Sequence, residues 1–341
     1  MSIIRWGERI SVRVSKRSLV IGAVAALVLL VISVLTLTAG DLGIALPNLL
    51  PAVVSSPGGK EGFVLERLRG PRLVVAVLTG AAFGISGALF QTVTRNPLGS
   101  PDIIGIGVGA GAGAAAFGLV WPGILPLPVG ALIGALVAIV LVWFGTGRGF
   151  SSPSRVIIVG IGVSAMGLSF IQYVIARAGR EEATVLAAYL NGSLASRDWA
   201  DAAIIVGALL VLVPAALLLG RRLALIEMGD EAADALGANA RGTRTWSILV
   251  AVGLSTAAVS VAGPIAFVAL ASPQVAKRLA RSPGANIALS AVMGAVMLTL
   301  ADLAVQQAPF GVQLPVGILT AVIGGLYLGY LLVREWKKGT L

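Results

Sequence analysis

The chain has 341 residues, of which 57% are hydrophobic and only 12% are charged, and its mean hydropathy is +0.97. A soluble domain carries about a quarter charged residues, so this composition excludes a soluble fold and predicts an integral membrane protein. Cysteine and histidine are absent, which excludes disulfides, thiolate catalysis, histidine metal ligands and histidine proton relays in this chain. The net charge of +10 is typical of basic cytoplasmic loops and does not indicate a nucleic-acid partner.

Apolar runs that match a bilayer crossing recur along the whole chain, since a span needs about 20 mostly apolar residues. The first run, Leu19–Leu37, follows a basic flank within residues 1–17. It is longer than the core of a signal peptide and no good cleavage site follows, so we interpret it as an uncleaved first span. The ten predicted spans are 18–38, 72–93, 102–120, 126–145, 156–176, 201–220, 246–262, 264–280, 286–304 and 316–333.

The distribution of charge predicts the orientation of these spans. With the N-terminus in the cytoplasm, most of the 25 Lys and Arg residues fall in cytoplasmic segments, as positively charged inner loops require. An even number of spans then places both termini in the cytoplasm. We therefore expect one transmembrane domain over residues 1–341, in the cell membrane, with cytoplasmic segments at 1–17, 221–244 and 334–341.

A faint internal repeat links the second span to the seventh and eighth. Leu73-Val74, Leu78, Ala81-Ala82, Gly87 and Pro97 recur at the same spacing as Leu249-Val250, Leu254, Ala257-Ala258, Gly263 and Pro273. In the predicted topology the two copies begin on opposite sides of the membrane. The sequence therefore predicts an inverted repeat, an arrangement common in transporters.

Catalytic and ion-coupling groups are scarce. Gly59-Lys60 is followed by Glu61, so the chain lacks the Gly-Lys-Ser/Thr of an ATP-binding loop. Asp302 is the clearest acid within a span, and an isolated buried acid favours a structural hydrogen-bonding role. A secondary carrier that works without ATP remains the alternative of another class. A membrane enzyme is disfavoured because no cluster of catalytic residues is present.

The longest cytoplasmic segment, 221–244, mixes acidic residues with apolar residues at helical spacing. It predicts a short amphipathic helix followed by a second, basic piece. The pattern leaves two interpretations open, a solvated connector and a docking helix for a cytoplasmic partner.

Several segments together resemble one known family. They are Leu68–Arg72 (LRGPR), Gly80–Gly111 (GAAFGISGALFQTVTRNPLGSPDIIGIGVGAG), Ile226–Gly237 (IEMGDEAADALG), Val261–Ala280 (VAGPIAFVALASPQVAKRLA) and Leu314–Leu332. These segments resemble the FecCD-type permeases, which serve ATP-binding cassette (ABC) importers of ferric siderophores, haem and cobalamin. The likeness extends over nearly the whole chain.

The resemblance implies an all-α membrane fold of the type II ABC importer class, with ten helices per subunit paired into a twenty-helix dimer. It implies a second permease subunit, two ATPase subunits and an extracytoplasmic substrate-binding protein as partners. The chain itself would be a non-catalytic transport subunit without a bound cofactor, with ATP and magnesium held by the ATPase. The residues expected to couple to the ATPase are Glu227, Met228, Gly229, Asp230, Glu231, Ala233, Leu236 and Gly237.

The resemblance also assigns docking and transport residues. Arg69 and Arg72 match arginines that dock the substrate-binding protein; the alternative is that they are positive charges at a membrane interface. Gln306-Gln307 stands where relatives can carry a third docking arginine. The motifs are most similar to permeases for enterobactin-type ferric siderophores, which work as heterodimers, with cobalamin or haem as alternative cargo. The pathway candidates in the fifth span are Ser164, Ser169, Gln172 and Tyr173, which have helix packing as the alternative role.

Overall fold

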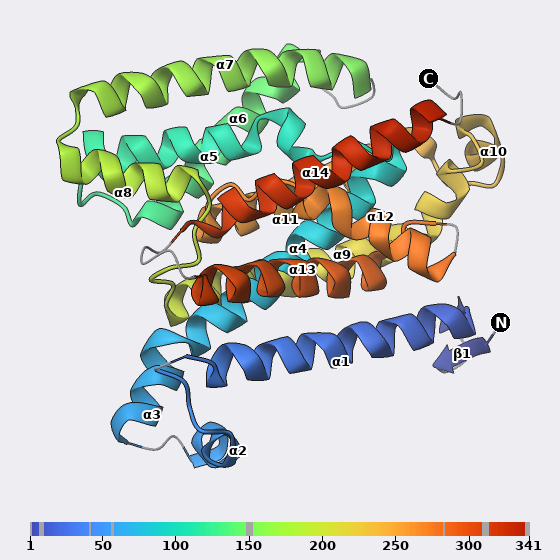
Figure 1. Cartoon of the computed structure of the whole chain (residues 1–341). Coiled ribbons are helices and arrows are strands. Elements are labelled where there is room, and N and C mark those ends of the chain that lie inside the picture. The colour runs from blue at the N-terminus through green and yellow to red at the C-terminus, as the bar shows by residue number, and fades with distance from the viewer. Residues whose placement is uncertain are drawn as a thin grey trace.

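The computed structural model describes residues 2–6, 10–40, 42–55, 58–147, 153–281, 284–308 and 314–337. Figure 1 shows a bundle of helices with a short N-terminal hairpin. In chain order the elements are β1 (Ser2–Trp6), β2 (Ile10–Val14), α1 (Lys16–Thr38), α2 (Leu46–Ser55), α3 (Gly59–Phe63), η1 (Val64–Leu68), α4 (Gly70–Thr94), η2 (Pro101–Ile104), α5 (Ile106–Ala115), η3 (Ala116–Val120), α6 (Leu127–Gly145), α7 (Pro153–Arg177), α8 (Arg180–Leu190), α9 (Trp199–Ile226), α10 (Asp230–Ala235), α11 (Ala240–Ala262), α12 (Val268–Ala280), α13 (Ile287–Gln307) and α14 (Val316–Lys337).

Helices occupy every range that the sequence predicts as a span, but they differ in length. Within the described residues, seven helices are long and apolar enough to cross a membrane. The segment 264–280 is helical only in α12, whose 13 residues reach about 20 Å at 1.5 Å per residue. A bilayer core is about 30 Å thick, so α12 by itself is too short to cross it.

The N-terminal hairpin was not expected from an all-α prediction. β1 and β2 pair antiparallel, with Ser2 opposite Val14 and Trp6 opposite Ile10. The alternation of apolar and polar residues in ISVRV favours such a strand. The hairpin precedes α1 and leaves the helical bundle unchanged.

The two ends of the bundle gather different elements. In Figure 1, the beginning of α1, the end of α14 and the helix α10 lie at one end of the bundle, which we call the α10 end. The helices α2, α3 and α8 lie at the opposite end, which we call the α8 end. The beginning of α1 and the end of α14 therefore lie on the same side, as an even number of crossings requires.

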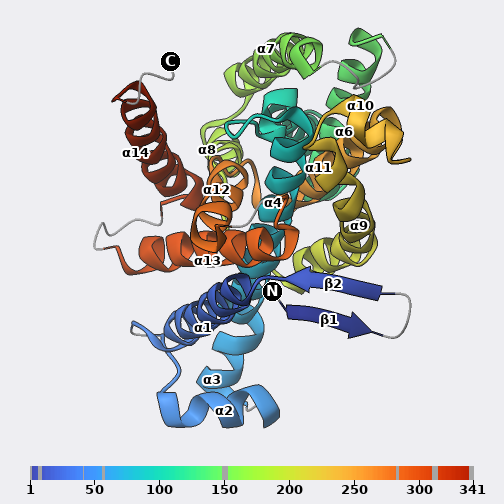
Figure 2. The ribbon, with the colours of Figure 1, turned by 90° about the vertical axis from the view of Figure 1, so that its right-hand side faces the viewer.

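α4 forms the centre of the fold and packs against α9, α11, α12 and α13, as the view in Figure 2 also shows. Glycines let α4 and α13 approach closely. A Cβ atom on Gly80 would collide with the backbone of Gly294, and one on Gly84 would collide with the backbone of Ser290. Small residues are the usual means of close helix packing in membranes.

Gly84→Ala is expected to destabilise the protein by about 1–3 kcal/mol, because the added methyl group must push α13 away from α4. Thermal unfolding in detergent measures the change. Gly22→Ala in α1 is the control, since no atom lies within 4 Å of a Cβ built there. Equal melting temperatures for the two variants would contradict the close-packed interface.

The two copies of the sequence repeat lie against each other and run in opposite directions. The Ser86 hydroxyl of α4 donates to the Ala251 carbonyl of α11, while Arg95, after the end of α4, and Arg244, near the start of α11, both bind Asp230. These pairings require antiparallel helices. Gly87 of α4 also lies close to Ala269 of α12, because a Cβ atom on Gly87 would collide with the Ala269 backbone.

Candidate functional site

The loop at the α10 end is shorter than the predicted amphipathic helix. α9 continues to Ile226, so residues 221–226 extend a span, and α10 comprises only Asp230–Ala235. Gly229 and Gly237 flank α10 with φ angles of 117° and 78°. This left-handed backbone favours glycine, which explains why these two residues bound the short helix.

Ion pairs attach this loop to three other helices. Asp230 binds Arg95 at 2.5 Å and Arg244 at 3.0 Å, which connects the loop to the end of α4 and the start of α11. Arg95 also donates to the Ile226 carbonyl at 2.6 Å. Glu227 lies 3.7 Å from Lys277 of α12. These ion pairs connect the loop to α4, α11 and α12.

The predicted coupling residues divide into buried and exposed groups. Ala233 is fully buried in a small cluster with Ile226, Ala238 and Ala240, so it supports the loop and cannot touch a partner protein directly. Met228 and Leu236 are 69% and 61% exposed. Glu231 is exposed as well. An anchored loop thus presents two large apolar side chains outward.

At the α8 end, Arg72 and Asp302 form a buried ion pair. The Arg72 Nε atom lies 3.0 Å from Asp302 Oδ2, and its Nη2 atom lies 2.7 Å from Oδ1. The side chains are 14% and 1% exposed. Gln306 donates to Oδ2 at 2.7 Å, so the Asp302 carboxylate has partners on both oxygens. This bidentate geometry joins the start of α4 to the end of α13.

Arg69 caps the C-terminal end of α1. Its Nη1 atom donates to the Thr36 carbonyl at 2.8 Å and to the Ala39 carbonyl at 2.6 Å. A cation at a helix C-terminus satisfies carbonyls that have no partner in the helix. The Arg72 side chain is therefore largely buried, and Arg69 is partly buried. A docking role for the two residues stays a prediction.

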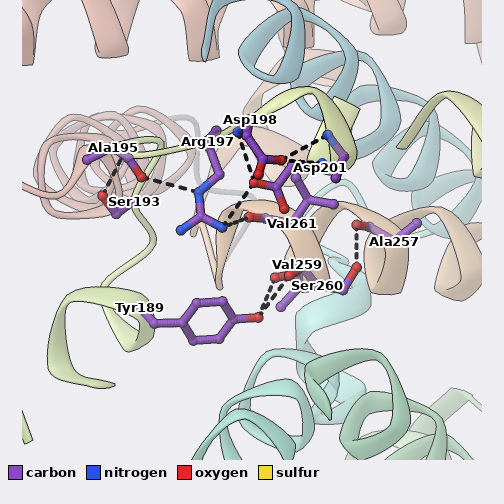
Figure 3. A network of polar contacts seen from close by, with 11 residues as sticks. Tyr189, Ser193, Ala195, Arg197, Asp198, Asp201, Ala257, Val259, Ser260 and Val261 are labelled. Carbon is purple, nitrogen blue, oxygen red and sulfur yellow. Dashed lines mark hydrogen bonds and ion pairs between the residues drawn. The ribbon is translucent and has the colours of Figure 1, made fainter. Parts of the chain in front are cut away.

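A strap between α8 and α9 covers the end of α11, as Figure 3 shows. The last turn of α11 leaves the carbonyls of Ser260, Val261 and Ala262 without partners further along the helix, because the chain turns away at Gly263, while the Val259 carbonyl accepts from the Gly263 amide. The last turn of α8 supplies the Tyr189 hydroxyl as a donor, and the strap supplies the Ser193 amide and the Arg197 guanidinium. The carbonyls are those of Val259 (2.8 Å from Tyr189), Ser260 (3.3 Å from Tyr189), Val261 (2.7 Å from Arg197) and Ala262 (2.9 Å from Ser193).

Sequence reasoning missed Tyr189 and Arg197 as cap residues. The available signal was the break at Gly263-Pro264, which predicts orphan carbonyls that need donors. Burial raises the pKa of the Tyr189 hydroxyl, so this group stays a neutral donor. The bond from Arg197 to the Val261 carbonyl places its positive charge at the negative end of the α11 dipole. Arg197 also lies 3.8 Å from Asp201 of α9.

Arg197→Ala is expected to lower the free energy of unfolding by about 1.5–3 kcal/mol, because it removes the charged donor that binds the Val261 carbonyl at the end of α11. Unfolding in detergent measures the loss. Arg180→Ala is the matched control, since Arg180 is exposed in the first turn of α8. A similar small loss in both variants would show that the cap contributes little.

A cavity of about 720 Å³ lies among α5, α7, α14 and the strap. Its walls are mostly apolar, and Asp102 and Asn191 are polar members of the lining. Leu168 and Ile171 of α7 and the start of α14 line it, so the predicted fifth and tenth spans do border a cavity.

The four predicted pathway side chains do not line that cavity. Ser164 and Ser169 donate to carbonyls one turn earlier, at 2.8 and 2.9 Å. Gln172 and Tyr173 are exposed, and the Tyr173 hydroxyl accepts from Arg177 at 2.8 Å. Ser169 and Tyr173 lie on the outward face of α7, so their pathway role stays a prediction.

The fold and these sites define a multi-pass membrane transport protein. Seven of the described helices are long and apolar enough to cross a membrane, and a mostly apolar cavity is lined by α5, α7 and α14. The sequence matches the FecCD transport family over residues 27–334. The chain belongs to this family, and the family predicted from the motifs is confirmed.

Two relatives cover almost the full chain. The ferric enterobactin transport system permease protein FepG of Escherichia coli is 36% identical and aligns with 95% of this chain and 99% of its own length. The Fe(3+)-citrate import system permease protein YfmE of Bacillus subtilis is 35% identical, with 96% and 98% covered.

Solved structures show the same fold. An inward-facing metal-chelate type ABC transporter superposes with a TM-score of 0.81 at 24% identity, covering 92% of this chain and 99% of the other. PsaBC from Streptococcus pneumoniae gives a TM-score of 0.54 at 22% identity, covering 78% and 92%. At these identities the likeness concerns architecture alone.

Proposed function

We propose that this chain is the permease subunit of an ABC importer that moves a ferric siderophore across the cell membrane. The observation that carries the proposal is the loop at the α10 end. Ion pairs fix it to α4, α11 and α12, yet Met228 and Leu236 remain largely exposed. Such a surface suits a groove on a partner ATPase, because exposed apolar side chains on a fixed support are typical interface anchors.

The proposed topology has ten spans and a type II importer architecture, with both termini in the cytoplasm. The eighth span combines the non-helical segment 264–267 with the short helix α12. The α10 end is then cytoplasmic and the α8 end faces outward. Support comes from α1 beginning and α14 ending at the α10 end, and from the basic residues Lys277, Arg278 and Arg281 at the end of α12 near that side.

In the proposed mechanism this chain hydrolyses no ATP and binds no cofactor. The ATPase subunits, with ATP and magnesium, move the loop through Met228, Glu231 and Leu236. Asp230 passes the movement to α4 through Arg95 and to α11 through Arg244. Because α4 packs against four other helices, the displacement changes how the helices around the cavity are arranged. Alternating access to the two sides follows.

The proposed assembly contains a second, related permease, two ATPase subunits and an extracytoplasmic substrate-binding protein. Ser169, Gln172 and Tyr173 lie on the exposed side of α7, where a second permease can complete the pathway with them. The substrate-binding protein docks at the α8 end. There Arg72 shapes the rim through Asp302, and Arg69, which is only partly buried, is the arginine more accessible to a docking partner.

The cargo assignment rests on relatives named for ferric enterobactin and Fe(3+)-citrate transport. Uptake of radiolabelled ferric enterobactin and ferric citrate into cells that lack this gene tests it, with labelled haem and cobalamin as the comparison. Loss of ferric siderophore uptake that the wild-type gene restores is expected. Loss of only haem or cobalamin uptake would reassign the cargo and leave the importer proposal intact.

A secondary carrier would transport without an ATPase. Proteoliposomes that contain this chain, its partner permease and the ATPase subunits are expected to accumulate substrate only when ATP is supplied to the ATPase side. Accumulation by the permease alone, driven by an ion gradient, would overturn the importer proposal.

A further inference from the structure

The short helix α2 uses only part of its surface to pack on the bundle. Leu49 and Ala52 are 9% and 0% exposed and join a small apolar cluster at the α8 end. The cluster also contains Leu37, Ile44, Val64 and Leu73. These contacts hold α2 against the end of α1 and the start of α4.

A second face of α2 is apolar and uncovered. Leu46, Leu50, Val53 and Val54 are 66%, 77%, 57% and 82% exposed, and no charged residue occurs among the ten of the helix. Their spacing of four, three and one residues places them on a single stripe at 100° per residue. So large an apolar stripe on a short external helix requires a covering surface.

The polar face of α2 lies opposite that stripe. Asn48 and Ser55 are exposed, and the Asn48 amide donates to the Glu61 carboxylate of α3 at 2.6 Å. Asn48 is about 160° around the helix from Leu50. One side of α2 therefore suits water, and the other suits an apolar medium.

The direction of α2 indicates which medium this is. Figure 1 views α2 almost end-on while α1 lies across the picture, and Figure 2 shows α2 lengthwise with α1 foreshortened. α2 thus lies crosswise to the spans, at the edge of the bundle. It begins soon after α1, whose Leu27, Leu30 and Val31 are exposed along a lipid-facing side. Because α2 packs on the end of α1, it lies beside this apolar surface.

We propose that α2 is an interfacial membrane anchor whose stripe Leu46, Leu50, Val53 and Val54 inserts into the lipid leaflet at the α8 end. Helices with one apolar face and one polar face bind in this way, with the apolar face about 5–10 Å into the boundary between headgroups and acyl chains. In the topology proposed above this is the outer leaflet. Through Leu49 and Ala52 the anchor fixes the level of the start of α4 relative to the bilayer.

Site-directed fluorescence tests the anchor on the full-length protein, which contains no native cysteine. Leu50→Cys and Val54→Cys report on the stripe, while Asn48→Cys and Ser55→Cys are the matched controls on the polar face. Each variant is labelled with a small environment-sensitive fluorophore and reconstituted in liposomes. Val24→Cys in the exposed face of α1 is the reference for lipid contact, and elution as a single species checks folding.

Lipids brominated near the top of the acyl chain are expected to quench the two stripe labels several-fold more than the two controls, and aqueous iodide is expected to show the reverse order. Iodide quenching of the stripe labels equal to that of the controls would place α2 in water and overturn the anchor. Protection from both quenchers would also overturn it, because a protein partner or a second copy would then cover the stripe. The fluorescence readout does not involve transport. The anchor can therefore be overturned while siderophore uptake persists, and uptake can be lost while the anchor is supported.

Discussion

Asp302→Ala is expected to lower the free energy of unfolding by about 3–5 kcal/mol, because it leaves the Arg72 guanidinium without its charge partner in a largely buried site. Arg72 is 14% exposed and Asp302 is 1% exposed, so water replaces few of the lost contacts. Gln306 would lose its acceptor as well. The start of α4 and the end of α13 would then separate more easily.

Reversible unfolding in mixed micelles measures this effect and compares it with that of a double variant without either charge. The variant Arg72→Met with Asp302→Leu removes both charges and is expected to recover much of the stability, because an apolar pair can replace a buried ion pair. Arg177→Ala is the control, since that residue is exposed and bonds only to its neighbour Tyr173 among the described side chains. A loss below about 1 kcal/mol for Asp302→Ala would show that the pair contributes no more than a surface salt bridge.

The double variant Met228→Glu with Leu236→Glu is expected to abolish ATP-driven uptake while the protein remains folded. Both side chains are largely exposed, so the packing of the described helices does not depend on them. At an interface, the loss of an apolar anchor costs about 2 kcal/mol or more. Each substitution should therefore weaken ATPase binding by about 30-fold.

Co-purification with the ATPase subunits and uptake of ferric siderophore measure the two consequences separately. Met228→Leu with Leu236→Met keeps two apolar side chains of similar size and is expected to retain both binding and uptake. Ala233→Glu should behave differently from the surface variants, because Ala233 is buried and its replacement is expected to unfold the loop. Normal uptake by the double glutamate variant would reject the loop as the ATPase contact.

The sequence alone determined the membrane class, the family and the approximate positions of the helices. Hydropathy is a local property, so a run such as 18–38 marks a helix wherever it packs, and α1 is found at Lys16–Thr38. The family motifs are contiguous segments and can be recognised without a fold. The predicted amphipathic segment 221–244 contains the short helix α10 at Asp230–Ala235, and its cytoplasmic position stays a prediction.

Only the tertiary structure decided which polar groups are free to meet a partner. Arg72 and Asp302 are far apart in the chain, and nothing in either neighbourhood indicates that α4 and α13 bring them to 2.7 Å. The same holds for Arg197, which reaches the end of α11 through a strap, and for α12, whose short length depends on the turn at Gly263–Phe267. The physical reason is that burial and pairing depend on contacts between distant helices, whereas the sequence pattern reports only on the preference of each segment for lipid or water.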